Sequence, residues 1–459
     1  MMSRQFQKPD YEAVLNKTIQ VSEVLPEEHL ARFVVDIISQ LDLEAIYRRY
    51  GTVGGRAIAP EVLLGLLLYA YANGVFSSRK IERATTENVA FGFVAGGLHP
   101  DHDTIANFRK TFLGEIQELF VQVLLLAKEV GVLKVGNISL DGSKIHADAS
   151  KSKAVSYKRL LQLEERLRSE VAELLSLGES ADQGDTVLPE GMVIQHEITR
   201  RQTRLENLAK AKAVLEARAN ERYKAERAEY EAKVREREER AKRKGRRPGG
   251  KPPQPPTPGP RDKDQYNFTD PDSRIMKNST DDGFNQHFNV QVGVDQASLL
   301  IVGHSLSNHP NDKAEAEPTL SASPDQLGQI GAAAMDNGFF SPANIQACQQ
   351  RGIDPYIATG RQTHHQSWQT FFAQESKPLA DSASPKVKMA YTLQTELGRE
   401  IYRLRKCTVE PVIGIIKEVL GFRQFSLRGL FAAAGEWALV CLAYNLKRLH
   451  VLEEQTAHA

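Results

Sequence analysis

The sequence predicts an α/β protein: a mixed sheet with flanking helices, preceded by an all-α N-terminal domain and interrupted by an α-helical coiled-coil insertion. Three observations lead to this prediction. Apolar residues recur at helical spacing in the first part of the chain, short runs alternate with a period of two further along, and leucines recur at heptad spacing between them. With 459 residues, 41% of them hydrophobic, the chain can form two or three domains with cores of their own.

Residues 1–115 are predicted to form the helical domain. One helix contains Leu30, Val34 and Ile38, and another begins at Pro60, a residue favoured in the first helical turn. Two short helices joined through Gly96 allow a helix-turn-helix, a motif that binds DNA. Its outer face would then carry three DNA-contacting residues, Asn107, Arg109 and Lys110. The alternative is a plain helical bundle that stabilises the catalytic domain or a dimer.

The predicted sheet comes from two separate parts of the chain, 116–155 and 266–459. The first strand covers 137–140 and ends on Asp141, which is followed at once by glycine. Later strands are expected at 287–294, at 298–307, up to Met335, and at 355–358, with a helix over 344–351. The alternation in 287–294 places every second residue on one face, which is typical of a half-buried strand.

The segment 156–247 is predicted to be a helical hairpin inserted between these two parts. Its heptad positions hold two sets of apolar residues: Leu160, Leu163, Leu167, Leu174 and Leu177, then Ile198, Leu205, Leu208 and Leu215. Such leucines are usually a packing seam, and here they could also mediate self-association. A basic segment rich in proline and glycine, 248–265, follows as an extended linker that cannot be helical.

The composition says more about the cellular location of the protein than about its function. The formal net charge is only +1, so overall charge gives no argument for nucleic acid, whereas the segment 399–428 is locally basic. Three cysteines without a CxxC pair make a zinc site or a disulfide framework improbable. The N-terminus lacks the apolar stretch of a signal peptide, and charged residues interrupt the apolar tail 431–449. We therefore expect a soluble, cytoplasmic protein that does not contact a membrane.

Three carboxylates stand out as candidate metal ligands: Asp141 and Asp336, each after a short apolar run, and Glu410 within the basic segment. Either aspartate taken alone is more often part of an ordinary turn. Together they could supply the hard oxygen ligands that Mg²⁺ prefers, and two such ions can hold the attacking and leaving oxygens of a phosphodiester. Pro411 disfavours helical geometry at Glu410, so a helix is expected to kink or restart there, with Lys417 pointing the same way as Glu410.

The combination resembles a known family. The chain is similar to DDE transposases of bacterial insertion sequences, specifically the type named IS eleven-eighty-two, with an InsH-like N-terminal domain and an IS-four-like catalytic domain. The matching segments run in order along almost the whole chain: 101–110, 140–145, 267–277, 289–295, 335–341, 409–412, 421–429 and 437–447.

The resemblance implies an RNase H-like catalytic domain in which Asp141, Asp336 and Glu410 are the catalytic, metal-binding triad. It implies two Mg²⁺ ions per active site, with Mn²⁺ as a substitute. Related transposases often carry Tyr, Arg, Glu and Lys around the third acid. Tyr402, Arg405 and Lys417 match, although one extra residue separates the arginine from Glu410, which leaves Lys406 as an alternative to Arg405. These residues, with Arg423 and Arg428, are predicted to contact DNA.

The expected function is therefore that of a transposase. It would bind the terminal inverted repeats of a mobile element, cut DNA in a Mg²⁺-dependent reaction and join the freed end to target DNA. The family further implies a homodimer or higher oligomer that works in the bacterial cytoplasm at the nucleoid. Two alternatives stay open: a domesticated DNA-binding protein without catalysis, and an RNase H-like nuclease without strand transfer.

Overall fold

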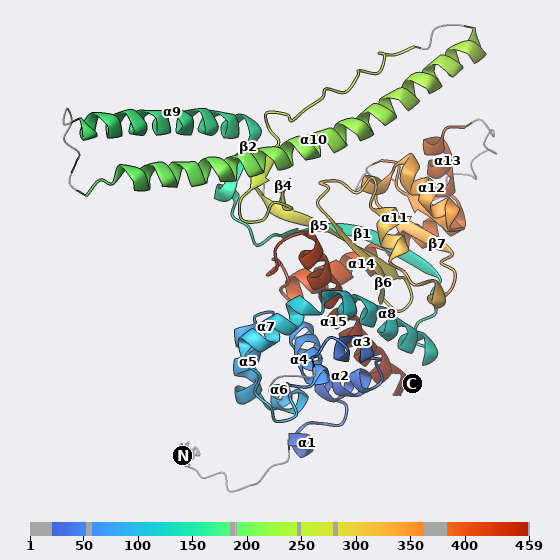
Figure 1. Ribbon diagram of the computed structural model, residues 1–459. Coiled ribbons are helices and arrows are strands. Elements are labelled where there is room, and N and C mark those ends of the chain that lie inside the picture. Colours follow the sequence, from blue (N-terminus) through green and yellow to red (C-terminus); the bar gives the residue numbers. More distant parts are fainter. Residues whose placement is uncertain are drawn as a thin grey trace, which may run out of the picture.

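The computed structural model describes residues 21–51, 57–183, 189, 191–245, 249–278, 283–360 and 383–457. It contains an N-terminal helical region, a mixed sheet with flanking helices and a long helical hairpin that projects from the sheet (Figure 1). The predicted fold class is confirmed at this level of description. Among the described residues, no helix combines the length and apolarity needed to cross a membrane.

The N-terminal region consists of short helices packed around α4. The bounds are α1 Val21–Val24, α2 Leu30–Ser39, α3 Glu44–Tyr47, α4 Pro60–Ala72, α5 Ser78–Glu87, α6 Val89–Val94, α7 His102–Thr111 and α8 Leu113–Glu129. Helix α4 begins with Pro60 as predicted and is buried on almost all sides, as expected for a helix that is apolar all round. Asp101 caps α7 by accepting a hydrogen bond from the Thr104 amide.

The last helix joins the N-terminal region to the sheet. Helix α15, Leu430–Ala457, packs against α4 and α8 on one side and against strand β6 on the other. Trp437 and Leu442 are buried in this contact, and Asn445 bonds both the amide and the carbonyl of Ile301 in β6. The prediction of a packed helix in the apolar tail is thus confirmed. One hydrophobic core continues from the N-terminal helices into the sheet.

The main sheet has six strands: β1 Asn137–His146, β4 Arg274–Lys277, β5 Phe284–Asp295, β6 Ile301–Ser307, β7 Ala332–Met335 and β8 Asp354–Ile357. Both β4 and β6 pair with β5, and the order continues β5–β1–β7–β8. The pairs β1–β5, β4–β5 and β5–β6 are antiparallel, whereas β1–β7 and β7–β8 are parallel. Strand β6 begins after the predicted Ser298, because the Asp295 carboxylate binds that residue in the preceding turn.

The first strand is longer than predicted. It was expected to end at residue 140 with Asp141 at its tip, but it continues to His146. The reason is that β5 pairs with it from Ile138 to His146, whereas β7 pairs only as far as Leu140. Asp141 therefore lies in mid-strand, at the point where the neighbouring strand β7 stops.

Helices cover both faces of the sheet. On one face, Ser139 of β1 contacts Thr408 of α14, Glu396–Gly414. On the other, Ser305 of β6 contacts Thr319 of α11, Ala316–Ser321. Helix α12, Pro342–Gln350, packs against α11, and α13, Pro385–Thr392, packs against β8. Because side chains alternate along a strand, odd-numbered residues of β1 face α14 and even-numbered ones face away from it.

The insertion forms the predicted hairpin of two antiparallel helices, α9 Tyr157–Asp182 and α10 Ile194–Lys244 (Figure 1). A two-stranded ribbon at its base pairs β2, Ala154–Ser156, with β3, Gln265–Asn267. A small core of its own contains Leu160, Leu167, Leu208 and Leu215, separate from the main core. The heptad leucines are therefore a packing seam between α9 and α10.

Replacing Leu167 with alanine is expected to loosen the hairpin while leaving the sheet intact. Leu167 is 4% exposed, and truncating a buried leucine costs about 2–5 kcal/mol. Hydrogen exchange should quicken across α9 and the facing part of α10 and stay unchanged in β5. Leu175→Ala on the same helix is the matched control, because that side chain is 52% exposed. Equal effects from both variants would contradict the seam.

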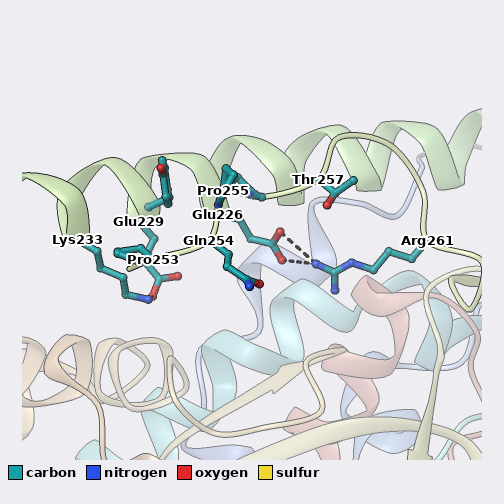
Figure 2. Close-up of a pocket in the computed structure, with 10 residues that line it drawn as sticks. Glu226, Glu229, Lys233, Pro253, Gln254, Pro255, Thr257 and Arg261 are labelled. Carbon is teal, nitrogen blue, oxygen red and sulfur yellow. Dashed lines mark hydrogen bonds and ion pairs between the residues drawn. The ribbon is translucent and has the colours of Figure 1, made fainter. Parts of the chain in front are cut away.

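The proline-rich segment returns along α10 (Figure 1), although most of its described residues are exposed. Its residues 253–257 lie beside the helix, with Glu226 paired to Arg261 at 2.8 Å (Figure 2). Arg237 further along α10 donates to the carbonyl of Gly250. The described part of the segment, 249–265, contains no helix, as predicted, but these contacts hold it against the hairpin.

Candidate acidic site on the sheet

Parallel pairing of β1 and β7 brings the two candidate aspartates together. Leu140 pairs with Met335, so Asp141 and Asp336 follow at equivalent positions of neighbouring strands. Asp141 accepts a hydrogen bond from the amide of Gly142 at 2.9 Å, and Asp336 accepts one from the amide of Gly338 at 2.7 Å. Each carboxylate is thereby oriented by the backbone of its own turn or strand.

Helix α14 brings Glu410 to the same region. Thr408 anchors the helix by donating to Ser139 at 2.8 Å, and Val409 is fully buried. The prediction of a kink or restart at Glu410 was wrong: α14 runs from Glu396 to Gly414 with Pro411 inside it. The adjustment comes after the proline, where Ile415–Val419 forms a π-helical turn. Burial of Val409 and Val412 against the sheet holds the helix through the position where proline removes a backbone donor.

Arg405 connects two of the three acids. Its guanidinium lies 3.0 Å from Oδ2 of Asp141 and 2.8 Å from Oε1 of Glu410. The side chain is only 10% exposed, and the Tyr402 ring lies 6.0 Å from its Cζ. Arg405 thus contacts both acids, whereas the side chain of Lys406 is exposed.

Negative charge is concentrated at Asp141. The pKa of its carboxyl is raised from 3.8 to about 6, chiefly by burial; Arg405 acts to lower it, and the neighbouring Asp336 and Glu410 add to the rise. Further along the same face of β1, Lys417 donates to Ser143 at 3.1 Å. Burial lowers the pKa of Lys417. The face of β1 toward α14 thus presents acids at one point and a lysine two residues on.

The chemistry of this site suits a hard cation, although the described residues do not form a complete metal site. No group of three or more His, Cys, Asp or Glu within the described ranges is arranged to hold a metal ion. The guanidinium of Arg405 lies between Asp141 and Glu410 and satisfies both. The donors are nevertheless carboxylate oxygens, which Mg²⁺ prefers, and Asp336 and Glu410 lie near enough to Asp141 to contribute to its raised pKa.

The other predicted DNA contacts lie in different surroundings. Arg423 pairs with Glu418, and Arg428 pairs with Asp148; both arginines are more than half exposed. On α7, Asn107 and Lys110 are exposed. Arg109 was predicted on the outer face as well, and this was wrong.

Arg109 is 7% exposed, and it donates to the Tyr71 hydroxyl at 2.8 Å and to the carbonyl of Phe76. The helical period explains the error, because position 109 falls on the same side of α7 as the buried Ile105.

A polar network behind the site was not foreseen from the sequence. Gln291 of β5 pairs with Gly142, and its side chain lies across that glycine on the face away from α14. Its amide donates to Asp312 at 2.6 Å. Alternation in β5 identified this strand but treated its polar positions as solvent-facing, whereas Gln291 is 1% exposed.

Gly142→Ala is expected to destabilise the protein by about 1–3 kcal/mol, the usual cost of overpacking. The new Cβ would lie 2.4 Å from Nε2 of Gln291, so the amide must leave its place. Urea unfolding measures the effect. Gly114→Ala in α8 is the control, because nothing lies within 4 Å of its new Cβ, and removing a helical glycine should stabilise by a few tenths to 1 kcal/mol. If Gly142→Ala leaves the free energy of unfolding unchanged, the side chain of Gln291 does not depend on the space above Gly142.

Comparison with known protein families supports a role in DNA transposition. Residues 19–111 match the model of a transposase domain (DUF772), and residues 256–446 match that of the transposase DDE domain. Neither curated proteins nor solved structures gave a match. Asp141 lies between the two matched segments, but pairing of β1 with β5 and β7 places it in the same sheet as the matched strands. These two matches are consistent with a DDE transposase of an insertion sequence, and the DDE domain implies a metal-dependent enzyme that cuts and transfers DNA.

Proposed function

We propose that this transposase binds the terminal inverted repeats of its element, cuts a DNA strand at each end and joins the freed end to target DNA. The observation that supports the catalytic part is the convergence of Asp141, Asp336 and Glu410 where β7 ends beside β1, with Arg405 bridging Asp141 and Glu410. The strand order β6–β5–β1–β7–β8, with three antiparallel and then two parallel strands, fits the RNase H-like fold that the DDE match implies.

In this proposal Asp141, Asp336 and Glu410 hold two divalent cations, Mg²⁺ or Mn²⁺. Bound there, the cations would neutralise charge on the phosphodiester and activate the attacking oxygen. Arg405 must release at least one of its two carboxylates as the cations bind, and Tyr402 keeps its guanidinium close by. Lys417 donates to Ser143, the next residue of β1 after Asp141 on the same face, and would there hold a strand phosphate beside the acids.

The reaction consists of two in-line displacements at phosphorus. In the first, water attacks the phosphorus at the element end and the bond to the 3′-oxygen breaks, which leaves a 3′-hydroxyl. In the second, that 3′-oxygen attacks a target phosphorus and displaces the 3′-oxygen of the target strand. The number of phosphodiester bonds is conserved in the second step, so no external energy source is needed.

We assign roles to the other parts of the chain from their place in the sequence and from their exposed residues. Residues 1–115 would bind DNA or stabilise the assembly, with Asn107 and Lys110 exposed on α7; residues 116–155 and 266–459 form the catalytic domain, 156–247 the hairpin and 248–265 the linker. Lys406, Arg423 and Arg428 are exposed basic residues suited to phosphate contact. We propose a homodimer or higher oligomer that brings two ends together at the bacterial nucleoid.

The test is incubation of the full-length protein with linear DNA that carries the sequences flanking its own gene. Cleavage at the repeat boundary with Mg²⁺, absent in EDTA and absent on scrambled ends, is expected. A labelled plasmid added as target then reports joining. Cleavage without joining would favour a nuclease, and specific binding without cleavage in Mg²⁺ or Mn²⁺ would favour a domesticated DNA-binding protein.

A further inference from the structure

Asp312 lies on the side of the sheet opposite α14, in the loop between β6 and α11. Two buried amides hold one of its oxygens: Asn289 donates to Oδ1 at 2.8 Å and Gln291 donates to the same atom at 2.6 Å. The two amides are 0% and 1% exposed. A carboxylate oxygen that accepts two buried N–H groups has a fixed orientation, because its rotation would break both bonds.

The other oxygen of Asp312 lies close to the second acid of the site. A Cβ atom placed on Gly338 would lie 3.2 Å from Oδ2 of Asp312 and 3.0 Å from Oδ1 of Asp336. The oxygens of Asp312 and Asp336 thus approach the same glycine, whose amide donates to Asp336. A side chain at position 338 would press against both carboxylates.

The backbone around Asp312 is also tied to the turn after Asp336. Asn344 donates to the carbonyl of Asp312 at 3.1 Å and to that of Phe339 at 2.8 Å, and Ser341 donates to the carbonyl of Lys313 at 2.6 Å. The loop and the turn therefore move together. Through Gln291, which lies across Gly142, the same carboxylate is linked to the residue that follows Asp141.

This arrangement leaves buried acceptors unsatisfied. Among the described residues, the buried side-chain oxygens of Asn289, Gln291 and Asn344 have no hydrogen-bond partner. Leaving a buried acceptor unpaired costs roughly 1–3 kcal/mol. The three amides thus direct their N–H groups to the Asp312 segment and not their oxygens.

We propose that Asp312 is a positioning residue for the acidic site: it fixes the turn that orients Asp336 and adds negative charge that favours a divalent cation there. The inference rests on the proposed function, since it assigns Asp312 to the site that would bind the cations. Residues behind metal ligands of this kind typically change metal affinity or activity by 10–100-fold when altered.

The test compares wild-type protein, Asp312→Asn and the control Asp354→Asn by thermal unfolding in a titration with Mn²⁺ and, separately, Mg²⁺. The Asn variant keeps an oxygen that can accept from Asn289 and Gln291 and loses only the charge, so it should fold. Asp354 is an exposed aspartate at the start of β8. A cation that binds only the folded state raises the unfolding temperature, so the titration midpoint reports its affinity without DNA.

For Asp312→Asn the cation concentration at the midpoint of the titration is expected to rise about tenfold or more. The unfolding temperature in EDTA and the binding of DNA ends should not change. Cleavage should fall in parallel and recover in part at high Mn²⁺. Gln291→Met keeps the charge of Asp312 but removes the hydrogen bond from Gln291 to it. This variant should raise the titration midpoint by a smaller factor. An unaltered midpoint in Asp312→Asn, or a lower unfolding temperature in EDTA with the same midpoint, would overturn the proposal.

The variant Asp336→Asn separates this inference from the proposed function. The cations should raise the unfolding temperature of the wild-type protein and not that of Asp336→Asn. If that control behaves as stated and Asp312→Asn does not differ from wild type, only the role of Asp312 fails. If neither cation stabilises the wild-type protein, the proposed acidic site and the inference fail together.

Discussion

Asp141→Asn is expected to abolish DNA cleavage while leaving the binding of DNA ends intact. In the proposed site Asp141 lies near both other acids, since Asp336 and Glu410 each act to raise the pKa of its carboxyl. Loss of a metal ligand removes several kcal/mol of transition-state stabilisation, and each 1.4 kcal/mol is a factor of ten in rate. The cleavage rate should therefore fall about a thousandfold or more, measured on end-labelled DNA. Residual cleavage within tenfold of wild type would refute the assignment.

The same substitution is expected to stabilise the metal-free protein in a pH-dependent way. The pKa of Asp141 is raised from 3.8 to about 6 in the folded state, mainly by burial. Folding therefore favours the protonated carboxyl, and wild-type stability falls as pH rises from about 4 to above 6. A shift of about two units corresponds to about 3 kcal/mol. Asp141→Asn carries no such charge and should exceed wild-type stability above pH 6.

Urea unfolding in EDTA at pH 4 and at pH 7.5 measures this difference. The two proteins should be nearly equal at the lower pH, and the variant should be more stable at the higher pH. Adding Mg²⁺ at pH 7.5 should stabilise only the wild-type protein, which reduces the difference in free energy of unfolding between the two proteins. A variant that is less stable than wild type at pH 7.5 would show that the bond to Arg405 outweighs the burial of the charge.

Arg109→Ala is expected to cost about 3–5 kcal/mol of folding free energy, the penalty for leaving a buried charge without its partner. Arg109 donates to Tyr71, and Tyr71 donates in turn to Glu436, which is fully buried in α15. The Glu436 carboxylate also accepts from the amides of Ser426 and Leu427. The network joins the N-terminal helices to the last helix, so the loss should lower the stability of the whole protein.

Thermal and urea unfolding of Arg109→Ala measure this cost, with Lys110→Ala as the neighbouring control. Lys110 is exposed, and surface substitutions usually stay within about 0.5 kcal/mol. The double variant Arg109→Met with Glu436→Gln should lose less than the sum of its single variants, because it removes both charges. Equal stability of Arg109→Ala and Lys110→Ala would exclude a structural role for the arginine.

Local patterns predicted most of the elements because their causes are local. Pro60 begins α4 and Ser341 begins α12, each as a capping or first-turn residue in the sequence. Heptad leucines predicted the hairpin, since Leu160 and Leu167 can be buried only against a second helix. The errors occurred where a distant partner decides the outcome. Pairing with β5 extends β1 to His146, and packing against the sheet carries α14 through Pro411.

The sequence by itself determined the kinds of groups present: two aspartates after apolar runs, a glutamate within a basic segment, and a helical insertion between the halves of a sheet. Only the tertiary structure decided which groups meet. Parallel register sets Asp141 beside Asp336, α14 places Arg405 between Asp141 and Glu410, and the helical period buries Arg109. Contacts between residues far apart in the chain depend on register and burial, and neither is encoded in the spacing of a single segment.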